Sequence, residues 1–273
     1  MLEKLQYINH IGEAIQFGNN GLFVNKNDLH DFAWSVTSKN DRISAFRKGV
    51  VKKTIPVLIA CNTEEEGIKA RNRIFEVMEK DVLAMKHGKI IINGYYLKCF
   101  ITGSKKKEYL KNKKVMQFSL SVQTDFPMWV KETTTTFNYG KGSQGTNLDF
   151  NNDFPYDYTS NLLGQSLNNT AFVPVEFRMN IYGPCINPKV TIAGHEYEVA
   201  KEFQANEYLT IDSREKTIIL THTDGTKENC FNLRNKESYI FEKIPVGVSQ
   251  VSNNGAFKFD MVLLEERGEP KWI

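Results

Sequence analysis

The sequence lacks the residue patterns on which most enzyme and metal sites are built. It has no G-x-S-x-G elbow, no G-x-x-x-x-G-K-[ST] phosphate loop, and no G-x-G-x-x-G that follows a strand pattern. The glycine-rich GKGSQG at 140–145 opens no helix, so we interpret it as a loop. The five histidines stand singly, without the HxH or HExxH spacing that gathers metal ligands. We therefore expect no catalytic residue, no cofactor-binding residue and no metal site.

Cysteine is scarce and scattered. The four cysteines are Cys61, Cys99, Cys185 and Cys230, and no two of them form a C-x-x-C pair for zinc or redox chemistry. Each lies among apolar residues of a strand pattern. We expect buried, reduced thiols.

Long hydrophobic runs and a strong charge of one sign are also missing. No stretch approaches the roughly 18 apolar residues of a membrane span, and MLEKLQYINHIGEAIQFG contains no apolar signal-peptide core. Thirty-five Lys and Arg balance 32 Asp and Glu to a net charge of +3, which predicts no sequence-specific nucleic-acid partner. We expect a soluble protein without a signal peptide and without a membrane partner.

The sequence does contain enough apolar residues to form sizeable cores, and most of them follow strand patterns. In 273 residues, 41% are hydrophobic. The first half has strand patterns from FAWSVT, in which Phe32, Trp34 and Val36 share one face, and continues with TIPVLIAC. The sequence thus predicts a mainly β fold.

One segment of the first half has the helical period instead. Residues 62–89 carry an apolar stripe made of Ile68, Ile74, Phe75, Met78 and Val82. Thr63 and Glu66 form the pattern of a capping box, and Gly88 after Lys86 and His87 is a plausible stop. The sequence predicts one packed helix.

Two further signals follow the helix. Asn93-Gly94 separates two β-rich runs by two residues, which predicts a type I′ hairpin. VMQFSLSVQ at 115–123 alternates apolar and polar residues. The lysine-rich residues 103–114 connect these two segments. They indicate either a solvated hairpin tip or an electrostatic contact for an acidic partner.

The middle of the chain has no sustained period. Residues 133–170 are rich in Asn, Gly, Thr and Ser, so we place the domain boundary at 136–170, as a linker or as an arm that another subunit orders. The aromatic side chains that favour a subunit-interface arm are Phe150, Phe154, Tyr156 and Tyr158.

The last hundred residues predict a β-sandwich over 171–273, after an N-terminal β domain with one helix over 1–135. VEFRMNI alternates as a half-buried strand, and Phe257, Phe259, Met261 and Leu263 share a face. Asp224-Gly225 and Asn254-Gly255 predict tight turns. Gly183-Pro184 and Asn187-Pro188 interrupt the pattern at the first edge of the sandwich, where we expect the chain to cross between sheets.

This order of elements resembles the siphophage distal tail protein family. The residues that carry the resemblance are FRKGVVKKTIPVLIA before the helix, NNDFPYDY in the linker, and IYGPCINPKVTIAG at the start of the sandwich. The resemblance covers nearly the whole chain.

The resemblance implies a structural protein of a phage or prophage tail tip, made in the bacterial host cytoplasm. It implies a hexameric ring formed by the N-terminal domain, which joins the tail tube protein to a baseplate protein or tail-associated lysin. It also implies an outward galectin-like C-terminal sandwich that can bear a receptor-binding protein.

Two other functions remain open from the residues. A sandwich can recognise cell-surface glycans through exposed aromatic residues, for which Tyr182, Tyr197 and Tyr208 are the candidates. A glycan-degrading enzyme would need two carboxylates that converge across a cleft, and sequence adjacency does not show that.

Overall fold

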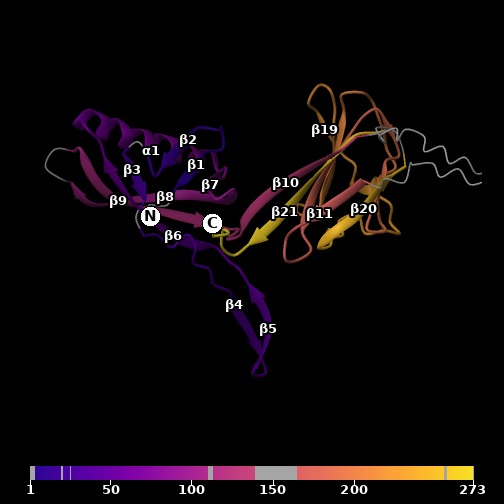
Figure 1. Ribbon diagram of the computed structural model, residues 1–273, viewed down its shortest axis with the longest axis horizontal. Coiled ribbons are helices and arrows are strands. Elements are labelled where there is room, and N and C mark those ends of the chain that lie inside the picture. The colour runs from indigo at the N-terminus through magenta and orange to yellow at the C-terminus, as the bar shows by residue number, and fades with distance from the viewer. Residues whose placement is uncertain are drawn as a thin grey trace, which may run out of the picture. The chain divides into compact units, whose positions relative to one another are not determined.

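The computed structural model describes residues 4–19, 21–24, 26–109, 113–138, 165–254 and 257–272 (Figure 1). By residue contacts the chain forms two compact units. The first unit is Met1–Lys131 with Glu266–Ile273, and the second is Glu132–Glu265. The sequence-based division into 1–135, 136–170 and 171–273 did not anticipate that the last eight residues return to the first unit.

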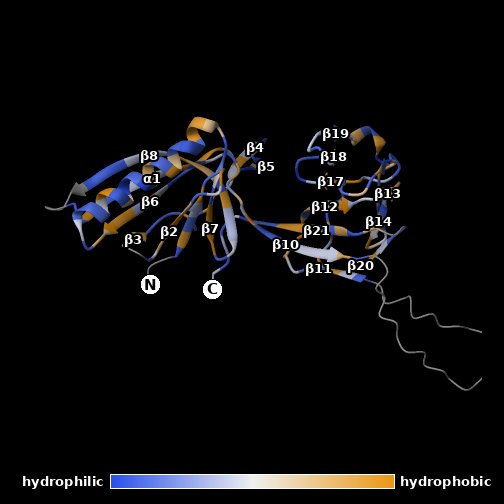
Figure 2. Ribbon diagram, turned by 90° about the horizontal axis from the view of Figure 1, so that it is seen from above, coloured by the Kyte–Doolittle hydropathy of each residue, from blue (hydrophilic) through white to orange (hydrophobic). Residues whose placement is uncertain are grey.

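The predicted fold class is confirmed: in the described residues the protein is mainly β, with one α-helix. The strands of the first unit are β1 (Leu5–Ile8), β2 (Ala14–Phe17), β3 (Leu22–Val24), β4 (Ser35–Lys39), β5 (Arg42–Arg47), β6 (Val51–Ala60), β7 (Gly88–Ile92), β8 (Tyr95–Tyr109), β9 (Val115–Thr124) and the start of β10 (Trp129–Phe137). In both units the strands mix hydrophobic and hydrophilic residues, as alternation requires (Figure 2).

Strand β8 organises the first unit. Its first half pairs with β7, which leads on to β1 and β2, and its second half pairs with β9, which leads on to β6 and β3. All of these pairs are antiparallel. The predicted alternation in β9 is confirmed, because Met116, Phe118, Leu120 and Val122 are all buried.

The predicted hairpin between β7 and β8 is confirmed. Asn93 and Gly94 connect the two strands with φ values of 51° and 79°. Both values are positive, as a type I′ turn requires, and Asn-Gly tolerates them best.

Helix α1 (Glu64–Ala84) begins as the sequence predicts. The Thr63 side chain accepts a hydrogen bond from the Glu66 backbone N–H at 3.2 Å, and the Glu66 carboxylate accepts one from the Thr63 backbone N–H at 3.3 Å. The predicted stop at Gly88 is wrong. Met85 caps the C-terminus in the left-handed region with φ 50°, and Gly88 opens β7.

Gly88 has a different reason to be glycine. A Cβ at this position would lie 2.3 Å from Asp81 Oδ2 and 2.3 Å from the Tyr7 hydroxyl. Asp81 is fully buried, accepts a hydrogen bond from the Tyr7 hydroxyl, and accepts another from the His10 backbone N–H at 2.8 Å. This network fastens α1 to β1, and it leaves no room for a side chain on β7.

The buried face of α1 differs from the predicted stripe. Ile74 and Met78 are buried with Gly67, Val77 and Asp81, but Ile68 is 39% exposed and Phe75 is 55% exposed. Gly67 lies on the buried face, where the connection before β9 approaches closely: a Cβ on Gly67 would lie 2.4 Å from the Lys113 carbonyl oxygen. Two of the five predicted core residues therefore point to solvent.

The second unit is built from two sheets. Its elements are the end of β10, β11 (Gln165–Asn169), β12 (Glu176–Tyr182), β13 (Cys185–Ile186), β14 (Lys189–Ile192), β15 (His195–Glu198), β16 (Glu202–Phe203), β17 (Tyr208–Asp212), β18 (Thr217–Thr221), β19 (Lys227–Asn229), the 3-10 helix η2 (Phe231–Leu233), β20 (Gly247–Asn253) and β21 (Phe259–Arg267). One sheet has the order β19-β18-β17-β12-β21-β10 and the other β11-β20-β14-β15, with β13 paired to β16. One core cluster contains side chains from both sheets, which is a sandwich arrangement.

The chain crosses between these sheets where the sequence predicts. Strand β12 ends at Tyr182, the Gly183–Pro184 peptide is cis, and β14 begins at Lys189 in the other sheet. However, β12 is a central strand that pairs with both β17 and β21, so its prediction as an edge is wrong. The Asp224-Gly225 turn is confirmed between β18 and β19, and the Asn254-Gly255 turn falls partly outside the described residues.

Candidate interaction site

An exposed apolar surface of the first unit lies on the hairpin of β4 and β5, which projects from the rest of the unit (Figure 1). FAWSVT was predicted as a strand in which Phe32, Trp34 and Val36 share one face. The strand begins only at Ser35, and these three side chains are 56%, 49% and 51% exposed. No third strand pairs with β4 or β5 in the described part of the chain.

One face of this hairpin is apolar. Val36 lies opposite Phe46, and Ser38 lies opposite Ile43, so these side chains point to the same side as Trp34. The Trp34 and Phe46 rings meet edge to face with centroids 6.4 Å apart. We define the hairpin face as Trp34, Val36, Ile43 and Phe46, each of which is 49 to 62% exposed.

The opposite face of the hairpin is polar. It presents Arg47 opposite Ser35, and Lys39 pairs with Arg42 beside the turn. Asn40 and Asp41 form this turn with φ values of 50° and 58°. A two-stranded ribbon in water is marginally stable by itself, and an exposed apolar face normally marks a surface that binds another protein.

Lys48 holds the base of the hairpin. Its Nζ lies 4.5 Å from the centre of the Trp34 ring and 5.9 Å from that of Phe32, and it contacts Met128 Sδ at 2.9 Å. Burial lowers the pKa of Lys48, and the neighbouring charge of Lys53 lowers it further. The cation therefore fixes the orientation of the aromatic residues that lead into β4.

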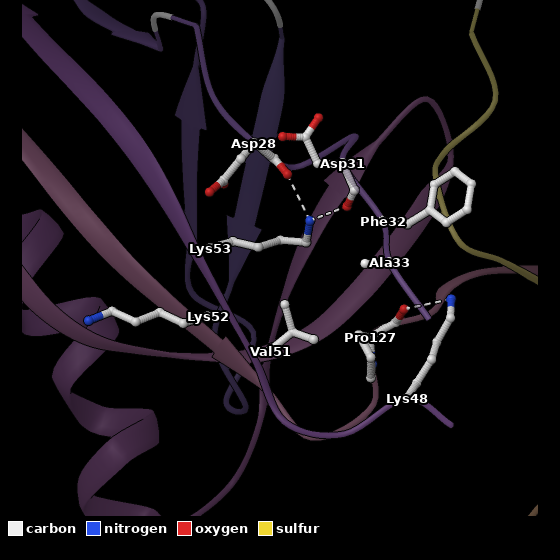
Figure 3. A pocket seen from close by; sticks show the side chains of 9 residues that line it. All are labelled: Asp28, Asp31, Phe32, Ala33, Lys48, Val51, Lys52, Lys53 and Pro127. Atoms are coloured by element: carbon white, nitrogen blue, oxygen red, sulfur yellow. Dashed lines mark hydrogen bonds between the residues drawn. The ribbon is translucent and has the colours of Figure 1, made fainter. Parts of the chain in front are cut away.

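A pocket of about 220 Å³ lies beside this base (Figure 3). Lys53, which is only 6% exposed, donates to the carbonyl oxygens of Asp28 and Asp31. The Asp28 side chain accepts from the Thr54 backbone N–H at 2.8 Å, while Lys52 points away from the pocket. Burial lowers the pKa of Lys53, and both aspartates counter this effect.

Two of these polar side chains, Lys53 and Asp28, bind backbone groups of the protein itself. Lys53 and Asp28 together fix residues 28–31 against β6, and the Trp129 indole donates to the Leu29 carbonyl oxygen at 3.3 Å. The described residues contain no group of three or more His, Cys, Asp or Glu that could hold a metal. The arrangement fixes the segments that lead into and out of the hairpin.

Among the described residues, no helix combines the length and apolarity needed to cross a membrane. The predicted arm residues Phe150, Phe154, Tyr156 and Tyr158 lie outside the described residues. The cysteines are all free; three are buried and Cys61 is half-buried.

The three tyrosines proposed for glycan contact are not all at the surface. Tyr197 is 1% exposed in the core, where its hydroxyl donates to the Glu242 carbonyl oxygen. Tyr182 and Tyr208 lie together on β12 and β17 with ring centroids 6.2 Å apart, and Tyr208 is 37% exposed. The Tyr182 hydroxyl donates to Asp260 at 2.6 Å, which raises its pKa to about 12.

Sequence reasoning missed the hairpin face, although a signal was present. Asn40-Asp41 separates two short runs that contain Trp34, Val36, Ile43 and Phe46, and Asn and Asp are residues that tolerate a tight turn with positive φ. Those apolar residues alternate like those of a buried strand, so their exposure is not readable from the pattern.

Known structures are similar to this fold over nearly the whole chain. The SPP1 Dit protein, described as a paradigm of the hub adsorption apparatus in phages that infect Gram-positive bacteria, matches with a TM-score of 0.59 at 7% identity, over 96% of this chain and 99% of that chain. Chains of the phage P2 baseplate in its activated conformation match with TM-scores of 0.58 with calcium and 0.60 with strontium. Their identities are 13% and 12%, and both matches cover 99% of this chain and 100% of that chain. No protein-family model and no curated protein matches the sequence.

Proposed function

We propose that this chain is a structural, non-enzymatic distal tail protein of a siphovirus or prophage. It forms a hexameric ring at the tail tip that connects the tail tube protein to the baseplate protein or tail-associated lysin and to the receptor-binding apparatus. The observation that carries the proposal is the shared fold with a phage hub protein and phage baseplate chains, which extends over 96 to 99% of this chain and includes both units.

The projecting hairpin supports an assembly role. A protein that acts alone in water gains nothing from four apolar side chains held about half exposed on a ribbon, whereas a subunit of an assembly buries them against a neighbour. Lys53 and Asp28 hold the backbone beside the base of the hairpin, and the carboxylates of Asp28 and Asp31 point in different directions (Figure 3).

The second unit fits the outward part of such a subunit. Its two sheets enclose a core of their own, as an independently packed, galectin-like sandwich requires. In this proposal the sandwich bears or contacts the receptor-binding protein, while the first unit forms the ring.

The test is the solution assembly of the full chain. Light scattering after size-exclusion chromatography should give a species about six times the 31.3 kDa chain mass at high protein concentration, and negative-stain images should show six-fold rings. A chain that stays monomeric at every concentration and salt, also in the presence of tail tube protein, would contradict the proposal.

A second candidate function rests on the Tyr182 and Tyr208 pair. This partly exposed aromatic pair is a surface on which a sugar ring can stack, beside Asp260, whose carboxylate accepts hydrogen bonds from the Tyr182 and Thr136 hydroxyls. Binding of the full chain to a glycan array, lost in Tyr208→Ala, would support it. An array without signal would remove it and leave the structural role as it stands.

A further inference from the structure

The first unit carries a second exposed apolar surface, on α1. Ile68, Phe75 and Leu83 are 39%, 55% and 78% exposed, and their spacing of seven and eight residues places them along one side of the helix. Glu65, Glu76 and Glu79 lie on the same side. We define the outer helix face as these six residues.

The outer helix face lies on the side of α1 opposite to the side that packs into the core. Ile74, Val77 and Met78 pack into the core, and a second, exposed row of apolar side chains, interspersed with glutamates, lies on the opposite side of α1. A surface helix of a protein that works alone needs one apolar stripe. The second stripe therefore calls for a partner, and Figure 2 shows hydrophobic residues gathered at the C-terminal end of α1.

We propose that the hairpin face of one copy packs on the outer helix face of the next copy in the ring. This inference rests on the proposed ring and names its contact. Each surface supplies apolar side chains that the other can bury, and in a single chain both remain exposed.

The charges around the two surfaces are complementary. The hairpin carries four basic side chains against the single acid Asp41. Lys39, Arg42 and Arg47 lie on its polar face and beside its turn, behind the hairpin face, and Lys48 lies at its base. The outer helix face carries three glutamates, and the basic side chains along one margin of it are Lys69, Arg73 and Lys80, of which Lys80 pairs with Glu13 at 2.8 Å. Opposite potentials orient two surfaces as they meet and suppress the pairing of a surface with its own kind.

The placement of the surfaces makes the contact head-to-tail. In the first unit, α1 lies on one side of the sheets and the hairpin leaves on the other side (Figure 1). Each copy therefore offers one hairpin face and one outer helix face in different directions. Such a heterologous contact generates a ring when the rotation closes.

Two single variants test the contact in the full chain. Phe46→Asp removes the hairpin face and Phe75→Asp removes the outer helix face, and both side chains are already exposed, so folding should be retained. Each variant alone should elute as a monomer at concentrations at which the wild-type chain assembles. Val248→Asp, a comparably exposed apolar site on β20 in the second unit, serves as the matched control and should assemble like wild type.

Mixing the two variants is the decisive step. Each retains the surface that the other has lost, so an equimolar mixture should form a one-to-one dimer that grows no further. Light scattering gives the mass, and circular dichroism verifies that both variants keep the wild-type melting temperature.

The possible outcomes separate the contact from the ring. If wild type assembles and the variants assemble equally well, or if the mixture stays monomeric, the contact is wrong and the ring proposal stands. A wild-type assembly that stops at a symmetric dimer overturns the head-to-tail contact. A wild-type chain that never assembles overturns the ring and this contact together.

Discussion

The Trp34 indole packs edge to face on the Phe46 ring across the β4–β5 hairpin, with 6.4 Å between ring centroids, while both side chains remain about half exposed. An aromatic pair of this kind contributes about 0.5–1.5 kcal/mol beyond the area that it buries. It gives the hairpin an ordered apolar face in a place where no part of the described chain covers it.

Assembly should therefore change the fluorescence of Trp34. In a Trp272→Phe variant the remaining indoles are Trp34 and Trp129, and Trp129 is buried already. As protein concentration rises, emission should shift to shorter wavelength and acrylamide quenching should fall, because the partner excludes water from Trp34. The Trp34→Phe, Trp272→Phe double variant should show neither change. A constant spectrum across the range in which the mass increases would place Trp34 outside the contact.

Lys53 should contribute to stability in a way that its neighbour Lys52 does not. Lys53→Met leaves the carbonyl oxygens of Asp28 and Asp31 without their donor, which should cost about 1–3 kcal/mol in the free energy of unfolding. Lys52→Met changes an exposed side chain that points away from the pocket and should change little. Urea denaturation measures both variants, and equal stability of the two would refute this role for Lys53.

The capping box of α1 should contribute measurably to the free energy of unfolding. Thr63→Ala removes the acceptor of the Glu66 N–H and should lower the free energy of unfolding by about 1 kcal/mol. Thr63→Ser keeps the hydroxyl and should stay close to wild type. Thermal and urea denaturation of the three proteins test this, and a serine variant as unstable as the alanine variant would show that the hydroxyl is not what stabilises the helix.

The His222 cluster should make the stability of the second unit depend on pH. The His222 Nδ1 lies 2.6 Å from Glu207 Oε1, and this hydrogen bond raises the pKa of His222. The backbone N–H of Gln204, and then His222, lower the pKa of Glu207. A raised histidine pKa stabilises the fold below the unfolded value of about 6.5, and this stabilisation is lost as the pH rises through the folded pKa.

For Glu207 the contribution to stability depends on pH in the opposite direction. The lowered pKa of Glu207 stabilises the fold above the unfolded value of about 4.3, and this contribution is lost as the pH falls through the folded pKa. The melting temperature of wild type should thus exceed that of His222→Gln most between about pH 4.5 and 6.5. The difference should shrink above that window, and a difference that grows with pH would contradict the assignment.

The sequence predicted the elements whose signals are local. Thr63 and Glu66 mark the start of α1 because a capping box involves only residues three apart, and Asn93-Gly94 marks a hairpin because the turn needs positive φ at two adjacent residues. Alternation predicted the buried side chains of β9 and β12, and the two prolines predicted where the chain leaves one sheet for the other.

The sequence did not predict which face of a helix or strand is buried. Ile68 and Phe75 match the helical period as well as Ile74 and Met78 do, but the core packs on the side of Ile74, Val77 and Met78. Likewise Phe32 and Trp34 alternate like core residues, yet they lead into a ribbon that projects from the unit. In both cases the period fixes which residues share a face and says nothing of what that face meets.

The amino-acid sequence by itself therefore determined a mainly β protein with one capped helix, tight turns at set positions and a crossover at Gly183-Pro184. Only the tertiary structure decided that residues 266–273 return to the first unit, that β12 is central in its sheet, and that two apolar surfaces of the first unit stay exposed. The physical reason is that caps, turns and periods arise between residues close in the chain, whereas burial depends on contacts between segments far apart in it.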